Sequence, residues 1–461
     1  MHPLMDMEIK PHILIVPSLG MGHLIPFVEI GKRLASLNAF SLIFITTNCN
    51  LSPRQIPYAQ DRLRSHSHDI RFVELPEIHI EPQKMAPVVM RTRVAEKSCG
   101  FLESLLGDFL ASALPICAFV TDMFNTAFLD VTAKLGIPSY LFVSSSASFL
   151  NFMFHLPVLD SQYDASFKDM DTPLEVPGLG MMDPRDVPSS VLDRSHEVYG
   201  CFLTNCCNLR KPRGILINTF QELEESAIET LEKGVGNPAM YPVGPIISFS
   251  AENPETSCLQ WLDRQPPRSV IFVSFGSEAT LSEAQIAKLA RGLEASEQRF
   301  LWVLRASLGS NPAGLLPPGF ESRNEGKGLV VHGWAPQVSV LSHPSTAAFV
   351  SHCGWNSTLE SLWCGVPMVA WPVMAEQGMN RNFMVETGAA VRVHMEADGA
   401  VAEEEVERAV REVMQGEHCE KARRRMEELQ KSAKSAVDQG GNSYESLLRV
   451  VCVWKENTAV L

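Results

Sequence analysis

The sequence predicts an α/β protein with two doubly wound domains, each built on a parallel sheet. The first observation is length, because 461 residues exceed one ordinary core and favour two domains of about 200 residues each. The second is alternation: short apolar runs typical of buried strands alternate with segments of helical apolar spacing, which predicts parallel sheets covered on both faces. The third is a globular composition, with 45% hydrophobic and 20% charged residues and no internal repeat.

The first half of the chain opens with a βαβ unit. Residues 12–16 form an apolar strand, and residues 40–46 form a second one. Between them, a turn at 17–22 leads into a segment whose apolar side chains recur at helical spacing. Further along we expect a strand over 117–121, a helix over 125–135, and strands over 139–143 and 214–218. Together these elements predict an N-terminal domain over residues 1–245.

The second half repeats this pattern without repeating the sequence. Strands are expected over residues 270–275, 300–304, 329–331, 348–351 and 368–371, with a helix over 282–295. A stretch rich in Pro, Gly and Ser predicts a linker over 246–257, ahead of a C-terminal domain over 258–440. The final segment, 441–461, carries an amphipathic helix that we expect to pack back on the N-terminal domain. Doubly wound sheets bind ligands at the carboxyl ends of their strands, so we expect the two domains to face a central cleft.

Charge and composition exclude several classes of function. The formal net charge of −14 argues against a nucleic-acid or anionic-membrane partner, because phosphate binding needs concentrated Lys and Arg. Residues 1–10 lack the features of a secretory signal, and no run approaches the roughly 18 apolar residues of a membrane helix. The 11 cysteines lie mostly in apolar runs, as buried free thiols do. We therefore expect a cytoplasmic monomer with no membrane span, in which the sequon at Asn356 is not glycosylated.

The most informative stretch is residues 334–377, WAPQVSVLSHPSTAAFVSHCGWNSTLESLWCGVPMVAWPVMAEQ. Near its centre a strand turns through Gly354 into a helix. A helix N-terminus offers free backbone N–H groups and the positive end of a dipole, so it attracts phosphate. His352, just before this terminus, can donate a hydrogen bond to the same anion, and Ser357 supplies a hydroxyl.

Three further polar side chains in this stretch suit a sugar nucleotide. Glu360 is a carboxylate one turn into the helix, where it suits a ribose diol. Glu376 and Gln377 follow the next strand and place a carboxylate and an amide where sugar hydroxyls could be bound. Taken singly, Trp334 suits a core aromatic and His352 a structural histidine. Their joint occurrence in one ordered segment favours the functional interpretation.

The segment 334–377 resembles, without a gap, the nucleotide-sugar signature of plant-type UDP-glycosyltransferases (family 1 glycosyltransferases). The resemblance extends over nearly the whole chain, including residues 273–277 and 20–23, and is nearest to the phenolic-compound glucosyltransferases of the family. It implies two Rossmann-like domains in the GT-B arrangement, in agreement with the strand pattern. It also implies hexose transfer from a UDP-sugar to a small acceptor.

The resemblance assigns roles to the donor-binding residues. It implies that Trp334 stacks on uracil, that Ala335 and Gln337 lie at the ring edge or the ribose, and that Glu360 binds the ribose hydroxyls. The residues implied around the diphosphate are Ser277, His352, Asn356 and Ser357, with Trp355 nearby. Glu376 and Gln377 are implied to bind the transferred sugar. Many family members carry Asp at the position of Glu376, and the longer side chain changes its reach. Gln377 in place of His points to UDP-glucose as the donor.

A catalytic pair is expected in the first half. His23 follows the first βα turn, and Asp122 follows the strand over 117–121. Both strand ends open on the same side of a parallel sheet, so the two side chains can meet. A histidine, with an unperturbed pKa near 6.5, suits proton transfer at neutral pH, and a neighbouring aspartate fixes its tautomer and stabilises imidazolium. The resemblance implies the same roles, base and orienting group.

The expected reaction is a single displacement with inversion that needs no metal and no other cofactor. His23 would deprotonate the acceptor as it attacks the anomeric carbon and UDP leaves. Cysteine and histidine neighbours such as Cys206–Cys207 and His352–Cys353 lack the spacing of metal ligands.

The acceptor is the least defined part of the prediction. Candidates for an apolar acceptor pocket are Met90, Phe124, Phe149 and Phe202, and a hydroxyl from residues 144–146 is a candidate for contact with the sugar. The overall resemblance favours a phenolic or flavonoid acceptor. A terpenoid or hormone acceptor, or attack through an aromatic carbon to give a C-glycoside, stays open.

The sequence argues against three rival functions. A nicotinamide-dependent oxidoreductase is suggested by Gly20 and Gly22 after a strand, but Ile25 replaces the third glycine and no acid follows the second strand. A serine hydrolase would need a G-x-S-x-G elbow, which the sequence lacks. A binding-only relative would lack His23 or Asp122, and both are present.

Overall fold

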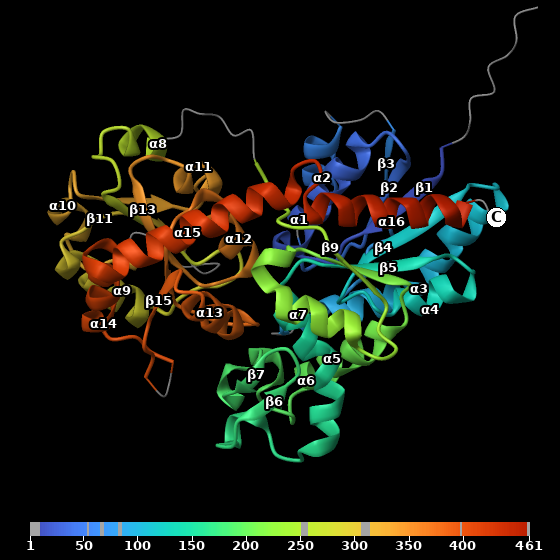
Figure 1. Cartoon of the computed structure of the whole chain (residues 1–461), viewed down its shortest axis with the longest axis horizontal. Helices are drawn as coiled ribbons and strands as arrows, with labels where there is room; N and C mark the ends of the chain where they lie inside the picture. The colour runs from blue at the N-terminus through green and yellow to red at the C-terminus, as the bar shows by residue number, and fades with distance from the viewer. Residues whose placement is uncertain are drawn as a thin grey trace, which may run out of the picture. The chain divides into compact units, whose positions relative to one another are not determined.

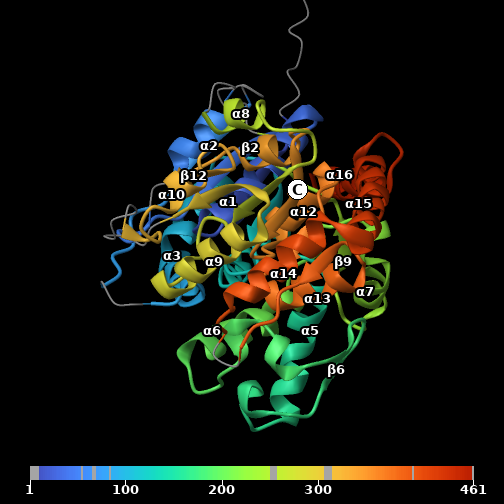
Figure 2. The same ribbon diagram turned by 90° about the vertical axis from the view of Figure 1, so that its left-hand side faces the viewer.

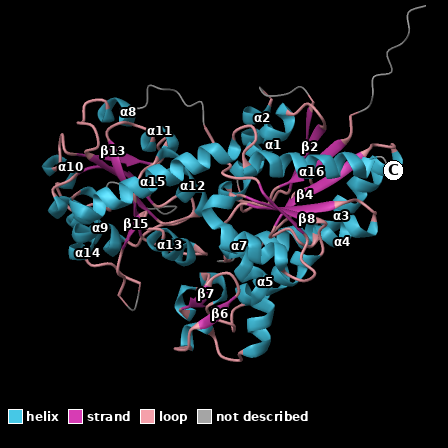
Figure 3. Ribbon diagram, in the orientation of Figure 1, coloured by secondary structure: helices cyan, strands magenta, loops and turns pink. Residues whose placement is uncertain are grey.

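The computed structural model describes residues 10–52, 55–64, 69–81, 85–249, 257–305, 314–396 and 399–458. The chain forms two compact units, Met1–Ile246 together with Ala436–Leu461, and Ile247–Ser435. Each unit holds one wholly parallel main sheet with helices packed on it (Figures 1 and 3). The predicted class of two Rossmann-like α/β domains is confirmed.

Unit 1 is built on a seven-stranded sheet in the order β3-β2-β1-β4-β5-β8-β9. Its strands are β1 (His12–Val16), β2 (Ser41–Thr46), β3 (Ile70–Glu74), β4 (Ile116–Asp122), β5 (Ser139–Val143), β8 (Gly214–Ile217) and β9 (Ala239–Pro242). The chain winds outward from β1 to β3 and then crosses back to β4. The strand order therefore reverses between β1 and β4, and doubly wound sheets bind ligands at such a point.

Helices cover both faces of this sheet. They are α1 (Met21–Ser36), α2 (Ile56–Leu63), α3 (Pro87–Ala111), α4 (Phe128–Lys134), α5 (Ala147–Gln162), α6 (Glu197–Cys207), α7 (Gln221–Lys233) and α16 (Asn442–Thr458). A small antiparallel pair and four 3₁₀ turns complete the unit: β6 (Leu174–Val176), β7 (Gly180–Met182), η1 (Phe167–Asp169), η2 (Pro184–Asp186), η3 (Ser189–Val191) and η4 (Asn208–Arg210). The first three residues of the helix expected over 125–135 are not helical, and α4 begins at Phe128.

The last helix, α16, belongs to unit 1 although it follows the whole of unit 2 in the sequence. Its Trp454 is fully buried, with ring centroids 6.2 Å from Phe40 and 5.4 Å from Tyr140. The two compact units divide between Ser435 and Ala436. Of the linker expected over 246–257, residues 250–256 lie outside the described part of the chain.

Unit 2 is built on a six-stranded sheet in the order β12-β11-β10-β13-β14-β15. Its strands are β10 (Val270–Ser274), β11 (Arg299–Leu304), β12 (Gly328–His332), β13 (Thr346–Ser351), β14 (Met368–Ala370) and β15 (Ala390–Arg392). Its helices are α8 (Ser257–Leu262), α9 (Glu283–Ser296), α10 (Phe320–Arg323), α11 (Gln337–Leu341), α12 (Trp355–Cys364), α13 (Gln377–Glu386), α14 (Glu403–Met414) and α15 (Gly416–Val437). Figure 2 shows α9 beside α14, which packs closely against it. Here the strand order reverses between β10 and β13.

All 11 cysteines are free, and six of them are buried. Among the described helices, none combines the length and apolar character that crossing a bilayer requires.

Candidate active site

The reversal point of the first sheet carries a histidine–aspartate pair. Asp122 is the last residue of β4, and His23 lies in the first turn of α1. Gly20 permits the sharp entry into α1, because its φ of 104° is accessible to glycine and strained for other residues. The Nδ1 atom of His23 lies 2.9 Å from Oδ2 of Asp122. A carboxylate only accepts hydrogen bonds, so Nδ1 donates and Nε2 is left as the basic nitrogen.

Asp122 is held as a carboxylate. The side chain has no exposed surface, and its second oxygen accepts a hydrogen bond from the backbone N–H of Phe124 at 2.9 Å. Burial raises the pKa of Asp122, but the charge of His23 and hydrogen bonds from His23 and Phe124 outweigh burial and leave the pKa lowered. The pair can therefore accept a proton at His23 and stabilise the resulting imidazolium.

Three of the four predicted acceptor residues form one aromatic group beside this pair. The Phe124 ring stands edge-on to His23 with centroids 5.4 Å apart, and Phe202 lies 6.3 Å from Phe124 and 6.1 Å from Phe149. Phe149 and Phe202 are almost fully buried, so they offer little surface to a ligand. Met90 is not part of this group and packs against a separate apolar cluster that includes Leu19.

The buried carboxylate of Glu224, which the sequence analysis missed, lies at the N-terminus of α5, just after β5. Glu224 accepts hydrogen bonds from the backbone N–H groups of Ala147 and Ser148, at 2.8 and 2.9 Å, and from the Ser148 hydroxyl. Ser146 caps the same helix, α5, through the N–H of Phe149. The N-terminus of α5 is therefore capped from inside the protein.

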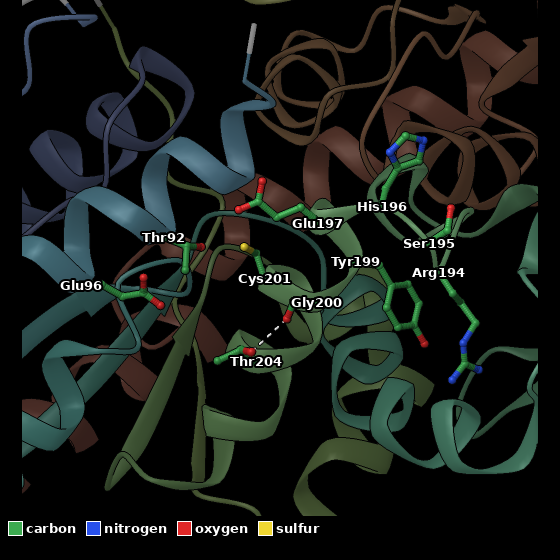
Figure 4. Close-up of a pocket in the computed structure, with 10 residues that line it drawn as sticks. All are labelled: Thr92, Glu96, Arg194, Ser195, His196, Glu197, Tyr199, Gly200, Cys201 and Thr204. Atoms are coloured by element: carbon green, nitrogen blue, oxygen red, sulfur yellow. Dashed lines mark hydrogen bonds between the residues drawn. The ribbon is translucent and has the colours of Figure 1, made fainter. Parts of the chain in front are cut away.

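A cavity of about 410 Å³ lies between α3 and the segment that forms α6 (Figure 4). It is lined by Thr92, Glu96, Arg194, Ser195, His196, Glu197, Tyr199, Gly200, Cys201 and Thr204. Thr92 and Glu96 come from α3, and the other lining residues belong to α6 or to the segment that leads into it (Figure 4). None of the four predicted acceptor residues lines this cavity, and most of its lining residues have polar or charged side chains.

The reversal point of the second sheet carries the centre of the long motif. After β13 the chain passes through Cys353, whose φ of 63° is left-handed, and enters α12 at Gly354. No side chain caps this N-terminus in the described structure. The ring of His352 packs so tightly that a Cβ atom added to Gly276 or Gly354 would lie 2.6 or 2.4 Å from it. Both glycines are thus required for the position of His352.

The His352 ring is neutral. Burial lowers its pKa to about 4, and the charge of Glu278 only partly opposes this effect. Within the described residues, its Nδ1 is a buried polar atom without a hydrogen-bond partner. A neutral imidazole with one unused nitrogen beside an uncapped helix N-terminus fits an oxygen-rich anion such as a diphosphate.

A second set of side chains lies along α12. Gln337, the first residue of α11, donates its amide N–H groups to the Ser357 hydroxyl at 2.8 Å and to Glu360 Oε2 at 2.7 Å. Burial raises the pKa of Glu360 to about 7, while the hydrogen bond from Gln337 opposes the rise. Trp334 lies just before this set with 63% of its surface exposed, whereas Ala335 is buried. An exposed tryptophan suits stacking on a base, and the Glu360 carboxylate suits a ribose.

Trp355 and Asn356 are the first two residues of α12, and three more predicted donor residues lie at the neighbouring strand ends. Ser277 follows β10 and is partly exposed. Glu376 is the N-cap residue of α13, and Gln377 is its first residue. The Gln377 carbonyl oxygen accepts hydrogen bonds from the N–H groups of Val373 and Met374, each at 2.9 Å, so its amide nitrogen is the group that can bind a ligand. Searching the described residues reveals no cluster of three or more His, Cys, Asp or Glu able to hold a metal ion.

The reversal point of the second sheet has an uncapped helix N-terminus, a neutral histidine and a carboxylate, which are features that suit a nucleotide sugar. Together with two Rossmann-like units, these features are those expected of a nucleotide-sugar-dependent glycosyltransferase. Residues 238–433 match the family model described as UDP-glucoronosyl and UDP-glucosyl transferase. The chain belongs to the UDP-glycosyltransferase family and is a glycosyltransferase with the GT-B fold.

Two curated relatives and one solved structure show how far the similarity extends. UDP-glycosyltransferase 72B1 of Arabidopsis thaliana is 37% identical, over 98% of both chains. Hydroquinone glucosyltransferase of Rauvolfia serpentina is 37% identical, over 97% of this chain and 99% of the relative. The structure of Phytolacca americana UGT2 complexed with UDP-2fluoro-glucose and pterostilbene superposes with a TM-score of 0.88 at 39% identity, over 97% of this chain and 100% of that one.

Proposed function

We propose that this enzyme is an inverting transferase that moves glucose from UDP-glucose to a hydroxyl group of a small hydrophobic acceptor, of the phenolic or flavonoid class. The observation that carries the proposal is the His23–Asp122 pair, in which a buried carboxylate orients an imidazole with Nε2 as its basic nitrogen. The acceptor class draws support from the aromatic group at Phe124, from a relative named hydroquinone glucosyltransferase, and from a similar structure that was complexed with pterostilbene.

The proposed step is one displacement. His23 Nε2 takes the proton of the acceptor hydroxyl as the oxygen attacks the anomeric carbon, and the bond from that carbon to the β-phosphate oxygen breaks. Asp122 stabilises the imidazolium through Nδ1–H. Negative charge that develops on the departing UDP is met by the His352 ring, the Ser277 hydroxyl and the N-terminus of α12.

The donor half-site is the set of unit 2 residues proposed to hold UDP-glucose. Its members are Ser277, Trp334, Ala335, Gln337, His352, Trp355, Asn356, Ser357, Glu360, Glu376 and Gln377. Trp334 would stack on uracil, Glu360 would accept hydrogen bonds from the ribose hydroxyls, and the Gln377 amide would donate to a glucose hydroxyl. We further propose that the enzyme acts as a cytoplasmic monomer, without a metal ion.

A mass-spectrometric screen tests the proposal. Purified enzyme is incubated with UDP-glucose, UDP-galactose or UDP-xylose and a panel of phenols, flavonoids and terpenoid alcohols, in the presence of a chelator. We expect a product that gains one glucose unit from UDP-glucose and a phenolic acceptor. His23→Ala should lower the turnover about 10²–10⁴-fold, whereas His418→Ala, which changes a partly exposed histidine of unit 2, should leave it unchanged.

Three outcomes would contradict parts of the proposal. Near-normal turnover of His23→Ala with a hydroxyl acceptor would exclude His23 as the base. A product whose sugar resists acid hydrolysis would identify a C-glycoside instead of an O-glycoside. Transfer only from another UDP-sugar, or only to terpenoid alcohols, would exclude glucose or the phenolic class.

A further inference from the structure

A buried arginine on α3 contacts both segments that carry the catalytic pair. Arg91 is only 7% exposed, and its Nε–H donates a hydrogen bond to the Leu19 carbonyl at 2.7 Å. Leu19 directly precedes Gly20, the N-cap residue of α1, and His23 follows within the first turn. This hydrogen bond therefore holds the turn from which His23 projects.

The same guanidinium lies over the residue that supports the other half of the pair. Its central carbon is 5.8 Å from the centroid of the Phe124 ring, within the range of a cation–π contact. Phe124 donates its backbone N–H to Asp122 and presents its ring edge-on to the His23 imidazole. From α3, Arg91 therefore contacts both the turn after β1 and the residues after β4.

Burial of a guanidinium is costly unless its hydrogen bonds and charge are compensated. A methionine or leucine at this position would fill the space without that cost, so packing alone does not account for an arginine here. The Leu19 carbonyl and the Phe124 ring compensate part of the cost, and both belong to the segments that carry His23 and Asp122. The Gln55 amide donates to the Ser18 carbonyl at 3.0 Å, so the same turn is held by a second buried side chain.

We propose that Arg91 is a positioning residue that keeps the His23 imidazole and the Asp122 carboxylate aligned for proton transfer. The inference rests on the proposed role of His23 as the base. Because a misplacement of about 1 Å can cost about 10²-fold in rate, loss of the Arg91 contacts should lower kcat about 10–100-fold. The KM for UDP-glucose should stay unchanged, since the donor half-site belongs to unit 2.

The experiment compares Arg91→Met and Arg91→Lys with a control, Arg210→Met. Arg210 also lies over a phenylalanine ring of unit 1, Phe154, at 5.0 Å, but its own side chain is exposed, so this control tests the loss of an arginine–ring contact alone. We expect Arg91→Met to lower kcat and to change the pH profile of kcat/KM. Arg91→Lys keeps the cation but loses the planar fork, so it should recover part of the rate. Arg210→Met should match the wild type in both measurements.

Two results would overturn the proposal. One is a kcat of Arg91→Met within twofold of the control. The other is a loss confined to the KM of anionic acceptors such as hydroxybenzoates, with kcat on the matching neutral phenol unchanged, because it would mean that Arg91 binds the acceptor directly. If Arg91→Met does not fold, as judged by its melting curve, Arg91→Lys decides alone: a lowered kcat at unchanged KM supports positioning, and a wild-type kcat overturns it.

A measurement that does not depend on turnover separates this inference from the proposed function. The imidazole ¹⁵N resonances of His23 report its tautomer and its contact with Asp122. We expect them to shift and broaden in Arg91→Met but not in Arg210→Met. If the wild type transfers no sugar and these resonances still depend on Arg91, the proposed function fails and the positioning role stands. Unchanged resonances in Arg91→Met overturn the positioning role, whatever the activity.

Discussion

Replacement of Glu360 by glutamine changes one property of the donor half-site, the charge of a single carboxyl group. Glu360 is partly buried on α12 and accepts a hydrogen bond from Gln337, which a glutamine oxygen can also accept. Burial raises the pKa of Glu360 from 4.5 to about 7, and the hydrogen bond from Gln337 opposes the rise. In the ligand-free enzyme at neutral pH, this carboxyl group is therefore partly protonated.

The raised pKa has a consequence for stability whose sign can be worked out. The folded chain holds this proton more tightly than the unfolded chain, so the carboxyl group weakens folding progressively as pH rises from about 4.5 to about 7. At 1.36 kcal/mol per unit of pKa shift, the raised pKa lowers the free energy of unfolding by about 3 kcal/mol above pH 7. This value is an upper bound, because water reaches part of the Glu360 side chain. Glu360→Gln should therefore raise the melting temperature at pH 8 by about 2–8 °C, and the gain should shrink toward pH 5.

The same substitution should weaken UDP binding and change its pH dependence. Ribose hydroxyl groups donate to a carboxylate, so binding favours the charged form of Glu360 and expels its proton. In the wild type, UDP affinity should rise by up to about tenfold per pH unit below pH 7 and level off above it. Titration calorimetry in two buffers of different ionisation enthalpy should detect about half a proton released per UDP at pH 7. The variant should lack this contribution, and ionisation of the phosphate cancels in the comparison.

Glu297→Gln serves as the control, because Glu297 is an exposed carboxylate of the same unit at the end of α9. It should leave both the melting temperature and the proton release unchanged. The reasoning would be refuted if Glu360→Gln were less stable than the wild type at pH 8. Equal proton release by Glu360→Gln and the wild type would also refute it.

Two further substitutions test the donor half-site. Trp334→Ala should weaken UDP binding by about 1–3 kcal/mol, which is what stacking a base on an aromatic ring usually contributes. Trp334→Phe should keep most of the affinity, and because Trp334 is exposed, neither substitution should change the melting temperature. Equal UDP affinity of Trp334→Ala and the wild type, measured by calorimetry, would exclude stacking. Gly276→Ala should weaken UDP binding at least about tenfold, or about 1.4 kcal/mol, because the new Cβ would lie 2.6 Å from the His352 ring. Gly326→Ala, at a similar φ but with open space around it, measures the backbone strain alone and should bind UDP normally.

The fold was predictable where strands are buried on both faces. β1, β4, β10 and β13 are mostly apolar, and the predicted ends of these strands agree with the structure to within a residue or two. The missed strands of the two main sheets, β3, β9 and β15, lie at the sheet edges. β3 is partly exposed, β9 ends in a proline, and β15 has three residues, so each lacks the apolar run that identifies a central strand.

The candidate site was predictable where a strand end determines the position. His23 and Asp122 follow neighbouring parallel strands, so their contact follows from topology. The contacts of Glu224 and Arg91 depend on how helices cross the sheet, which local sequence does not encode. Glu224 lies in a helix rich in acids, Gln-Glu-Leu-Glu-Glu, where one buried carboxylate looks like its exposed neighbours.

The return of α16 to unit 1 has a consequence for the order in which the protein folds as it is made. The surface of unit 1 that receives Trp454, between Phe40 and Tyr140, is synthesised long before α16. At about 5–20 residues per second, the ribosome needs roughly 10–40 s to make the segment from residue 247 to α16. For that time the sheet of unit 1 lacks one covering helix, and the apolar side chains that pack against Trp454 in the finished protein have no such partner.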